Sequence, residues 1–188
     1  MNYCSECGSD RLVYRLPQGD TRKRTVCNSC GHTFYSNPKI VTGCILEWQK
    51  RILLCKRAIE PRINLWTVPA GFLENGESVI EAAAREAEEE ACAKSENLVI
   101  HSFYNIRYVN QVYILYRGSL KDGNYGVGHE SNDAMLCAET DIPWQQIAFP
   151  VIADALKLYF ADRGRCHYQY HEGDIYKGDD NQARIVRY

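Results

Sequence analysis

Apolar residues that alternate with polar ones predict most of the chain as short β-strands. Gln49-Lys50 separates two apolar runs, and Val109-Asn110 separates two longer segments that are rich in aromatic residues. Alternation with a period of two is typical of strands that turn one face toward a core. The predicted strands, in chain order, are Ile40–Trp48, Arg51–Arg57, a short strand within Leu65–Gly71, Asn97–Tyr108, Gln111–Leu120 and Ala134–Glu139.

Apolar spacing of three and four residues predicts two helices. Ser78 followed by Glu81 has the pattern of a capping box, so the first helix is expected to begin there. The positions of this helix that are expected to pack on a sheet are Ile80, Ala84, Ala87 and Ala91. The second helix is predicted over Phe149–Arg163 and ends at Gly164. The main part of the chain is therefore expected to be α/β.

The two ends of the chain differ from this main part. Leu12–Leu16 and Arg22–Val26 predict a small hairpin, and Asn37-Pro38 marks a boundary, so we expect a domain at residues 1–36 and another at 37–188. The glycine-rich segment Lys121–Gly128 is expected to be a mobile loop. The polar tail after Gly164 is expected either to pack against a partner subunit or to stay loose.

Composition narrows the functional classes. Apolar residues make up 45% of the 188 residues, which is enough for a core, and the net charge of -2 gives no strong case for a nucleic-acid or membrane surface. No apolar run reaches membrane-spanning length, and the first residues do not resemble a signal peptide. We therefore expect a cytoplasmic protein, or an organellar one if a transit peptide has been removed.

Four of the nine cysteines form two matched pairs near the N-terminus. Two residues separate the members of each pair, and 19 residues separate the pairs, a spacing typical of a zinc site. Four thiolates fill a tetrahedral Zn²⁺ shell, so this zinc is expected to be structural. A redox CxxC motif is a weaker hypothesis, because no βαβ pattern surrounds the pairs. The predicted ligands are Cys4, Cys7, Cys27 and Cys30.

The first helix carries an unusual concentration of carboxylates. Glu86, Glu89 and Glu90 lie three and four residues apart, and Arg85 is the one basic residue beside them. Such a run is often only a solvated acidic face. Here a glycine-bounded loop precedes the helix, and a hard divalent cation such as Mg²⁺ (or Mn²⁺) would offset the repulsion between the carboxylates.

The stretch Gly71–Ala93 resembles the Nudix box. That pattern consists of a glycine, five residues, a glutamate, seven residues and then the run Arg-Glu-apolar-x-Glu-Glu-x-Gly-apolar. Cys92 stands at the second glycine of that pattern. A cysteine is less suited than glycine to a left-handed helix cap, so the helix could instead run on to Asn97. Because it carries both this stretch and the cysteine pairs, the chain resembles zinc-ribbon Nudix hydrolases. That resemblance implies an α/β/α sandwich on a mixed sheet, preceded by a small four-cysteine zinc ribbon.

The resemblance also implies site residues. Box glutamates Glu86, Glu89 and Glu90 and the carbonyl of Ala70 would hold Mg²⁺, and Arg85 would orient them. Glu77 would shape the loop, and a loop glutamate, for which Glu130 is the candidate, would assist in catalysis or metal binding. The candidate substrate-binding residues are Arg57 as a phosphate clamp, Trp66, and Tyr104 on an aromatic strand. For Trp66, packing in the core is the more common role and a stacking platform is the alternative.

Segments such as LLCKRAIEP and LWTVPAGFLENGES are most similar to the FAD and ADP-ribose pyrophosphatases. This implies Mg²⁺-dependent hydrolysis of a nucleoside diphosphate linked to another moiety, with release of AMP, by an enzyme that is commonly a homodimer. NADH pyrophosphatases carry a Ser-Gln-Pro-Trp-Pro-Phe-Pro segment where this chain has Ile147–Pro150, which disfavours NADH. Two further hypotheses are a non-catalytic regulator that senses ADP-ribose and an RNA-decapping enzyme.

Overall fold

A computed structural model describes residues 1–188 as two units, Met1–Asn37 and Pro38–Tyr188. The smaller unit is an antiparallel sheet in the order β1 (Leu12–Arg15), β2 (Arg24–Cys27) and β3 (Thr33–Phe34). The predicted hairpin is present, with β2 beginning two residues later than expected. Gly8 and Gly31 follow the second cysteine of each pair and adopt φ of 71° and 77°, a left-handed conformation that glycine takes without a steric penalty.

The larger unit contains a nine-stranded mixed sheet in the order β10-β5-β4-β9-β8-β11-β12, with β6 paired to β5 and β7 to β4. β4 runs parallel to β9 and β11 runs parallel to β8, whereas the other pairs are antiparallel. Its elements are β4 (Lys39–Trp48), β5 (Arg51–Arg57), β6 (Trp66–Thr67), β7 (Ala70–Phe72), α1 (Val79–Ala91), β8 (Ser95–Ile106), η1 (Arg107–Val109), β9 (Gln111–Leu120), β10 (Ser131–Cys137), η2 (Glu139–Asp141), η3 (Trp144–Gln146), α2 (Pro150–Gly164), β11 (His171–Lys177) and β12 (Ala183–Arg187).

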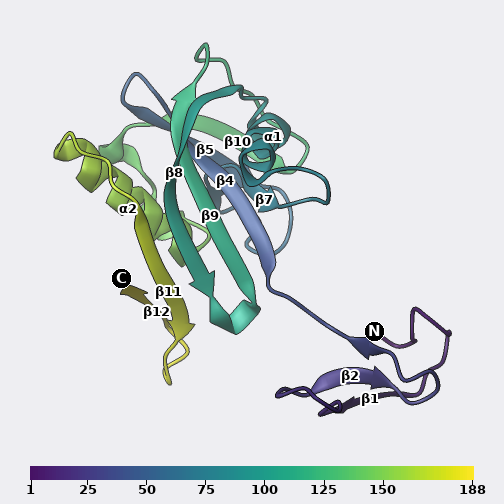
Figure 1. The fold of residues 1–188 in the computed structure, drawn as a ribbon. Helices are drawn as coiled ribbons and strands as arrows, with labels where there is room; N and C mark the ends of the chain where they lie inside the picture. Colours follow the sequence, from purple (N-terminus) through teal and green to yellow (C-terminus); the bar gives the residue numbers. More distant parts are fainter. The chain divides into compact units, whose positions relative to one another are not determined.

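Helices α1 and α2 cover opposite faces of this sheet (Figure 1). Alternation along β4 explains the layering, because Ile45 packs in the cluster with α2 while Cys44 and Leu46 pack in the cluster with α1. The prediction of an α/β/α sandwich on a mixed sheet is confirmed. No helix combines the length and apolar character needed to cross a membrane.

Helix α1 begins as predicted, and the face that it presents to the sheet matches the predicted one only in part. The Ser78 side chain accepts from the backbone N–H of Glu81 and the Glu81 side chain accepts from that of Ser78, which completes the capping box. Ile80, expected to pack on the sheet, is 42% exposed. Ala87 and Ala91 are buried as expected, and the buried face also includes Ala82, Ala83, Glu86 and Glu90.

Helix α1 ends at Ala91, so the extension to Asn97 does not occur. Cys92 takes the left-handed cap conformation at φ 49° and ψ 31°, and its N–H reaches the carbonyls of Ala87 and Glu88. Asn97 is also left-handed, with φ 56°, but it lies where β8 shifts register against β9. Cys92 therefore ends helix α1, whereas Asn97 lies at the register shift between β8 and β9.

The prediction for the C-terminal tail was wrong. β11 and β12 form a hairpin that extends the main sheet beside β8, with Ile175 fully buried. β12 is anchored because the Arg187 side chain donates to the carboxylate of Asp154 in α2. The tail is therefore an integral part of the larger unit.

Candidate active site

The loop ahead of α1 brings backbone and carboxylates into close contact. Ala70 and Gly71 lie in β7, which pairs with β4. A Cβ built on Gly71 would lie 2.3 Å from Oε1 of Glu86, so only glycine leaves room for that carboxylate. The backbone N–H of Ala70 donates to Oε2 of Glu90 at 3.1 Å. The strand corner and the helix therefore fix each other at this point.

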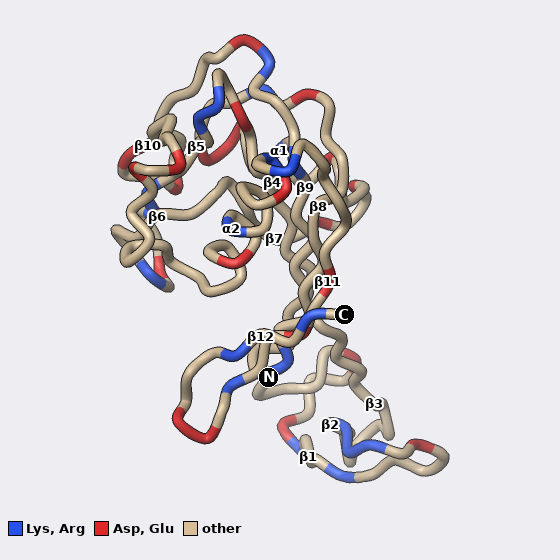
Figure 2. The backbone as a smooth tube through the Cα atoms, turned by 90° about the vertical axis from the view of Figure 1, so that its left-hand side faces the viewer, with Lys and Arg blue, Asp and Glu red and all other residues tan.

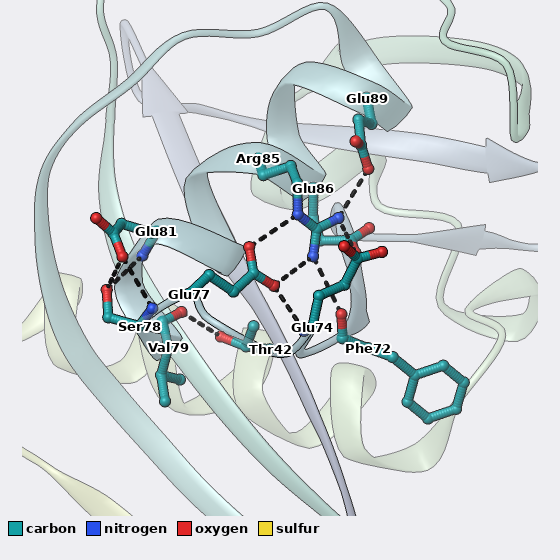
Figure 3. Close-up of polar contacts among 10 residues, drawn as sticks. All are labelled: Thr42, Phe72, Glu74, Glu77, Ser78, Val79, Glu81, Arg85, Glu86 and Glu89. Atoms are coloured by element: carbon teal, nitrogen blue, oxygen red, sulfur yellow. Dashed lines mark hydrogen bonds and ion pairs between the residues drawn. The ribbon is translucent and has the colours of Figure 1, made fainter.

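Arg85 is the centre of the polar network in Figure 3. Its guanidinium donates two bonds to Glu77, at 3.0 and 2.8 Å, and one bond of 2.8 Å to each of Glu86 and Glu89. A further bond reaches the carbonyl of Phe72 at 3.1 Å. The Arg85 bonds, followed by the backbone N–H of Glu74, lower the pKa of Glu77 to about 2. Arg85 thus links the loop to the helical carboxylates.

Two of the three box carboxylates are buried on the sheet-facing side of α1. Glu86 and Glu90 are 7% and 4% exposed, whereas Glu89 is exposed. Burial raises the pKa of Glu90 to about 8, against the Ala70 hydrogen bond, and the charge of Glu86 raises it further. Burial also raises the pKa of Glu86, although Arg85 opposes the shift. Close carboxylates that water solvates poorly are a suitable oxygen donor set for Mg²⁺ or Mn²⁺.

These carboxylates line a cavity of about 620 Å³ in the larger unit. Of the predicted residues, the cavity lining includes Ala70, Arg57, Arg85, Glu130 and all three box glutamates. Glu130 follows the glycine-rich segment, whose end is tied to α1 because the N–H groups of Gly126 and Gly128 donate to the carbonyls of Ala91 and Glu90. This attachment brings the end of the predicted mobile loop onto the helix and Glu130 to the site.

Arg57 reaches the cavity as a largely desolvated cation. Its side chain is packed against the ring of Phe149 at 5.2 Å, and its Nε donates to the carbonyl of Pro61 at 2.9 Å. These contacts leave the two terminal nitrogens without a protein partner in the hydrogen-bond network around Arg57. A guanidinium held in this way is suited to phosphate oxygens.

Trp66 and Tyr104 do not line the cavity, contrary to their prediction as substrate contacts. Trp66 is 7% exposed and belongs to the core, with the Lys56 ammonium 5.7 Å from its ring centroid. Tyr104 is 1% exposed, and its hydroxyl donates to Asp154 at 2.7 Å. Packing of β8 against α2 directs Tyr104 into the core.

The sequence reasoning missed the aromatic residues that do line the cavity. Phe72, Tyr113 and Phe149 contribute to it, and Phe72 is 48% exposed with the Lys39 ammonium 5.1 Å from its ring centroid. The position of Phe72, directly after Gly71, was an available signal. Tyr113 faces Tyr104 across the β8–β9 pair, so strand alternation alone could not separate their roles.

The four N-terminal cysteines form a second cluster, within the smaller unit. Their sulfur atoms all lie within 4.8 Å of one another, with Cys4 and Cys30 at 3.7 Å and Cys7 and Cys27 at 3.6 Å. A disulfide would need about 2.0 Å. Sulfur atoms around a tetrahedral zinc with bonds of about 2.3 Å lie about 3.8 Å apart, so the cluster fits Zn²⁺.

Comparison with known proteins identifies both units. Residues 37–154 match the NUDIX domain model. The chain belongs to the Nudix family. Residues 2–36 match the Nudix N-terminal zinc-ribbon model, in agreement with the cysteine cluster. A Nudix hydrolase from Nitrosomonas europaea, known from a crystal structure, is 44% identical, has a TM-score of 0.89 and covers 94% of this chain and 100% of its own.

The curated relatives of this Nudix hydrolase are named for two kinds of activity. An NAD-capped RNA hydrolase, NudC, from Photobacterium profundum is 25% identical over 146 residues, which is 76% of this chain and 52% of that protein. An ADP-ribose pyrophosphatase from Methanocaldococcus jannaschii is 39% identical over 59 residues, which is 31% of this chain and 35% of that protein. The chain thus spans about half or less of the length of these relatives.

Proposed function

We propose that this Nudix hydrolase cleaves the diphosphate of FAD or ADP-ribose in the presence of Mg²⁺ and releases AMP. The observation that carries the proposal is the composition of one cavity, which combines buried carboxylates, the desolvated cation Arg57 and exposed aromatic area at Phe72. An anionic diphosphate joined to flat rings requires these three features. The ADP-ribose pyrophosphatase among the relatives is consistent with this substrate class.

Each group has a chemical task in this proposal. Glu86, Glu89, Glu90 and the Ala70 carbonyl would hold Mg²⁺ or Mn²⁺, which when bound neutralises phosphate charge and lowers the pKa of a coordinated water. Arg57 binds phosphate oxygens with its free terminal nitrogens. A carboxylate of the box, or Glu130, accepts the proton of the attacking water. Phe72 supplies a ring face for adenine or flavin, at about 1–3 kcal/mol per stacked ring.

NADH pyrophosphatase activity is the second candidate, because several curated relatives are named NAD-capped RNA hydrolases. The segment Ile147–Pro150, which lacks the Pro-Trp-Pro-Phe-Pro residues expected of an NADH pyrophosphatase, disfavours it. A ligand sensor without catalysis is disfavoured by the burial of Glu86 and Glu90, since binding alone does not require desolvated carboxylates. A homodimer is proposed from the family resemblance, and light scattering of the purified protein tests it.

The test is AMP release from FAD, ADP-ribose and NADH at equal concentration with Mg²⁺. We expect higher kcat/KM for FAD or ADP-ribose than for NADH, and a steep loss in Glu89→Gln. Glu88→Gln is the matched control, because Glu88 is exposed on the same helix and does not line the cavity. A clearly higher kcat/KM for NADH would refute the substrate assignment, and no AMP release from any of the three would refute the diphosphatase proposal.

A further inference from the structure

A second group of potential metal ligands lies in the larger unit, away from the cavity. It consists of His101 in β8, Asp162 in α2 and His171 in β11, which are 0%, 0% and 8% exposed. One ligand atom from each residue lies within 4.8 Å of the others. None of the three lines the cavity, and two of them lie beyond residue 154, where the NUDIX match ends. The group is therefore independent of the site described above.

His101 has one ring nitrogen available as a metal ligand. Its Nε2 lies 3.0 Å from the carbonyl oxygen of Ala155, and because a carbonyl only accepts, Nε2 carries the hydrogen. The other ring nitrogen, Nδ1, is then left with a lone pair. This atom is buried and has no hydrogen-bond partner, which is uncommon for a buried polar group. Histidines that bind metals typically donate their other N–H to a backbone carbonyl or a carboxylate in this way.

Asp162 and His171 complete the donor set. The carboxylate of Asp162 accepts from Nε2 of His171 at 2.8 Å, from Arg165 at 3.1 Å and from the backbone N–H of Gln169 at 3.2 Å. These donors hold a buried carboxylate in its charged form. Moving the ring hydrogen of His171 to Nδ1 frees Nε2 as a ligand without a change in net charge. Two imidazole nitrogens and one carboxylate oxygen suit Zn²⁺ and other divalent transition metals.

We propose that His101, Asp162 and His171 bind one divalent transition-metal ion such as Zn²⁺. The three ligands come from three elements, and the ion would tie the C-terminal hairpin of β11 and β12 to β8 and α2. β11 runs parallel to β8 (Figure 1), and their pairing begins at His171, so the site lies at the start of that pairing. Binding to the folded state alone would stabilise the hairpin.

Metal counting on the full chain tests this site. The protein is stripped with a chelator, reloaded with Zn²⁺ in the presence of excess Mg²⁺ to occupy the box carboxylates, desalted and analysed for zinc. We expect two equivalents in the wild type, one in the four-cysteine ribbon and one here, and one equivalent in His101→Gln and His171→Gln. His167→Gln is the matched control and should keep two, because His167 is exposed and lies between Asp162 and His171 in sequence.

A wild type that retains only one equivalent would overturn the proposal, as would loss of the second equivalent in His167→Gln. If the buried-histidine variants do not fold, Co²⁺ binding in excess Mg²⁺ by a full-length chain with all four ribbon cysteines changed to serine provides the decision. We expect one equivalent of Co²⁺ with d–d absorption and no thiolate-to-metal charge-transfer band. Absence of such a Co²⁺ complex would show that the three residues form a structural network without metal.

Discussion

The substitution Gly71→Ala should impair the candidate site while leaving the stability of the fold nearly unchanged. Gly71 has an ordinary φ, so alanine meets no backbone penalty there. The new Cβ would lie 2.3–2.4 Å from three atoms of the Glu86 carboxyl group and would force that group to retreat by about 1 Å to reach ordinary contact. Glu86 is the end of a flexible side chain, so we expect a change in unfolding free energy of less than about 1 kcal/mol.

The catalytic effect should be much larger. Metal ligands tolerate errors of about 0.2 Å, and a misplacement of about 1 Å in an active site lowers rate by about 10²-fold. We therefore expect kcat/KM for AMP release to fall about 10²-fold, with a higher Mg²⁺ concentration needed for half-maximal rate. Displacing Glu86 also loosens its 2.8 Å bond to Arg85, which adds to the loss.

The assay is a Mg²⁺ titration of AMP release, combined with thermal unfolding of the same preparation. Gly164→Ala is the matched control, because a Cβ at Gly164 would meet nothing within 4 Å and its φ is also ordinary. Wild-type kcat/KM and Mg²⁺ dependence in Gly71→Ala would refute the placement of Glu86 at the metal site. A loss of stability as large as the loss of activity would show instead that the contact is structural.

Three further predictions concern separate features. Because Arg85 holds the folded-state pKa of Glu77 near 2, below its ordinary 4.5, this pair stabilises the fold above pH 4.5 and its contribution is lost as pH falls from 4.5 to 2. Glu77→Gln should therefore flatten the pH dependence of the melting temperature in that window, and an unchanged slope would contradict the ion pair. Cys92→Gly should stabilise by about 1 kcal/mol, since it removes a left-handed cysteine, with unaltered Mg²⁺ dependence; chemical denaturation measures it. Cys4→Ser should lose the ribbon zinc by elemental analysis, and retention of that zinc would refute the ligand set.

Local patterns predicted the features whose causes are local. The capping box at Ser78 and the two-residue turn at Gln49-Lys50 depend on neighbours a few residues away. The C-terminal hairpin was missed because its stability depends on a partner distant in sequence. β11 pairs with β8, about 70 residues earlier, and a short polar strand shows no strong alternation by itself.

The net charge of the chain gave limited guidance about the site. Figure 2 shows acidic and basic residues dispersed along the backbone without a long run of one sign, in keeping with the net charge of -2. The candidate site residues that line the cavity were named from motif spacing and family resemblance, whereas Phe72 and Tyr113 required the register of β7 and β9. Tyr104 was misassigned because both aromatic residues of the β8–β9 pair satisfy the same alternation.

The buried face of α1 distinguishes this acidic helix from one whose carboxylates are all solvated. Alanines at 83, 87 and 91 allow close approach to the sheet, and Glu86 and Glu90 are buried on the same side. The metal-free pKa of Glu90 is raised to about 8, above its ordinary 4.5, so the folded state retains a proton that the unfolded state loses between these values. In chelator, the stability of the wild type should therefore fall as pH rises from 4.5 to 8.

Glu90→Gln removes that ionisation while the side-chain oxygen can still accept from the Ala70 N–H. The variant should be more stable than the wild type in chelator at pH 8, less responsive to Mg²⁺ in melting temperature, and nearly inactive. This opposition between stability and activity follows because the carboxylate is desolvated to bind a cation. Thermal unfolding from pH 5 to 8, with and without Mg²⁺, measures the stability and its response to Mg²⁺, and AMP release measures the activity. A variant that is less stable than the wild type in chelator at pH 8 would show that Glu90 supports the fold, and the reasoning from burial would fail.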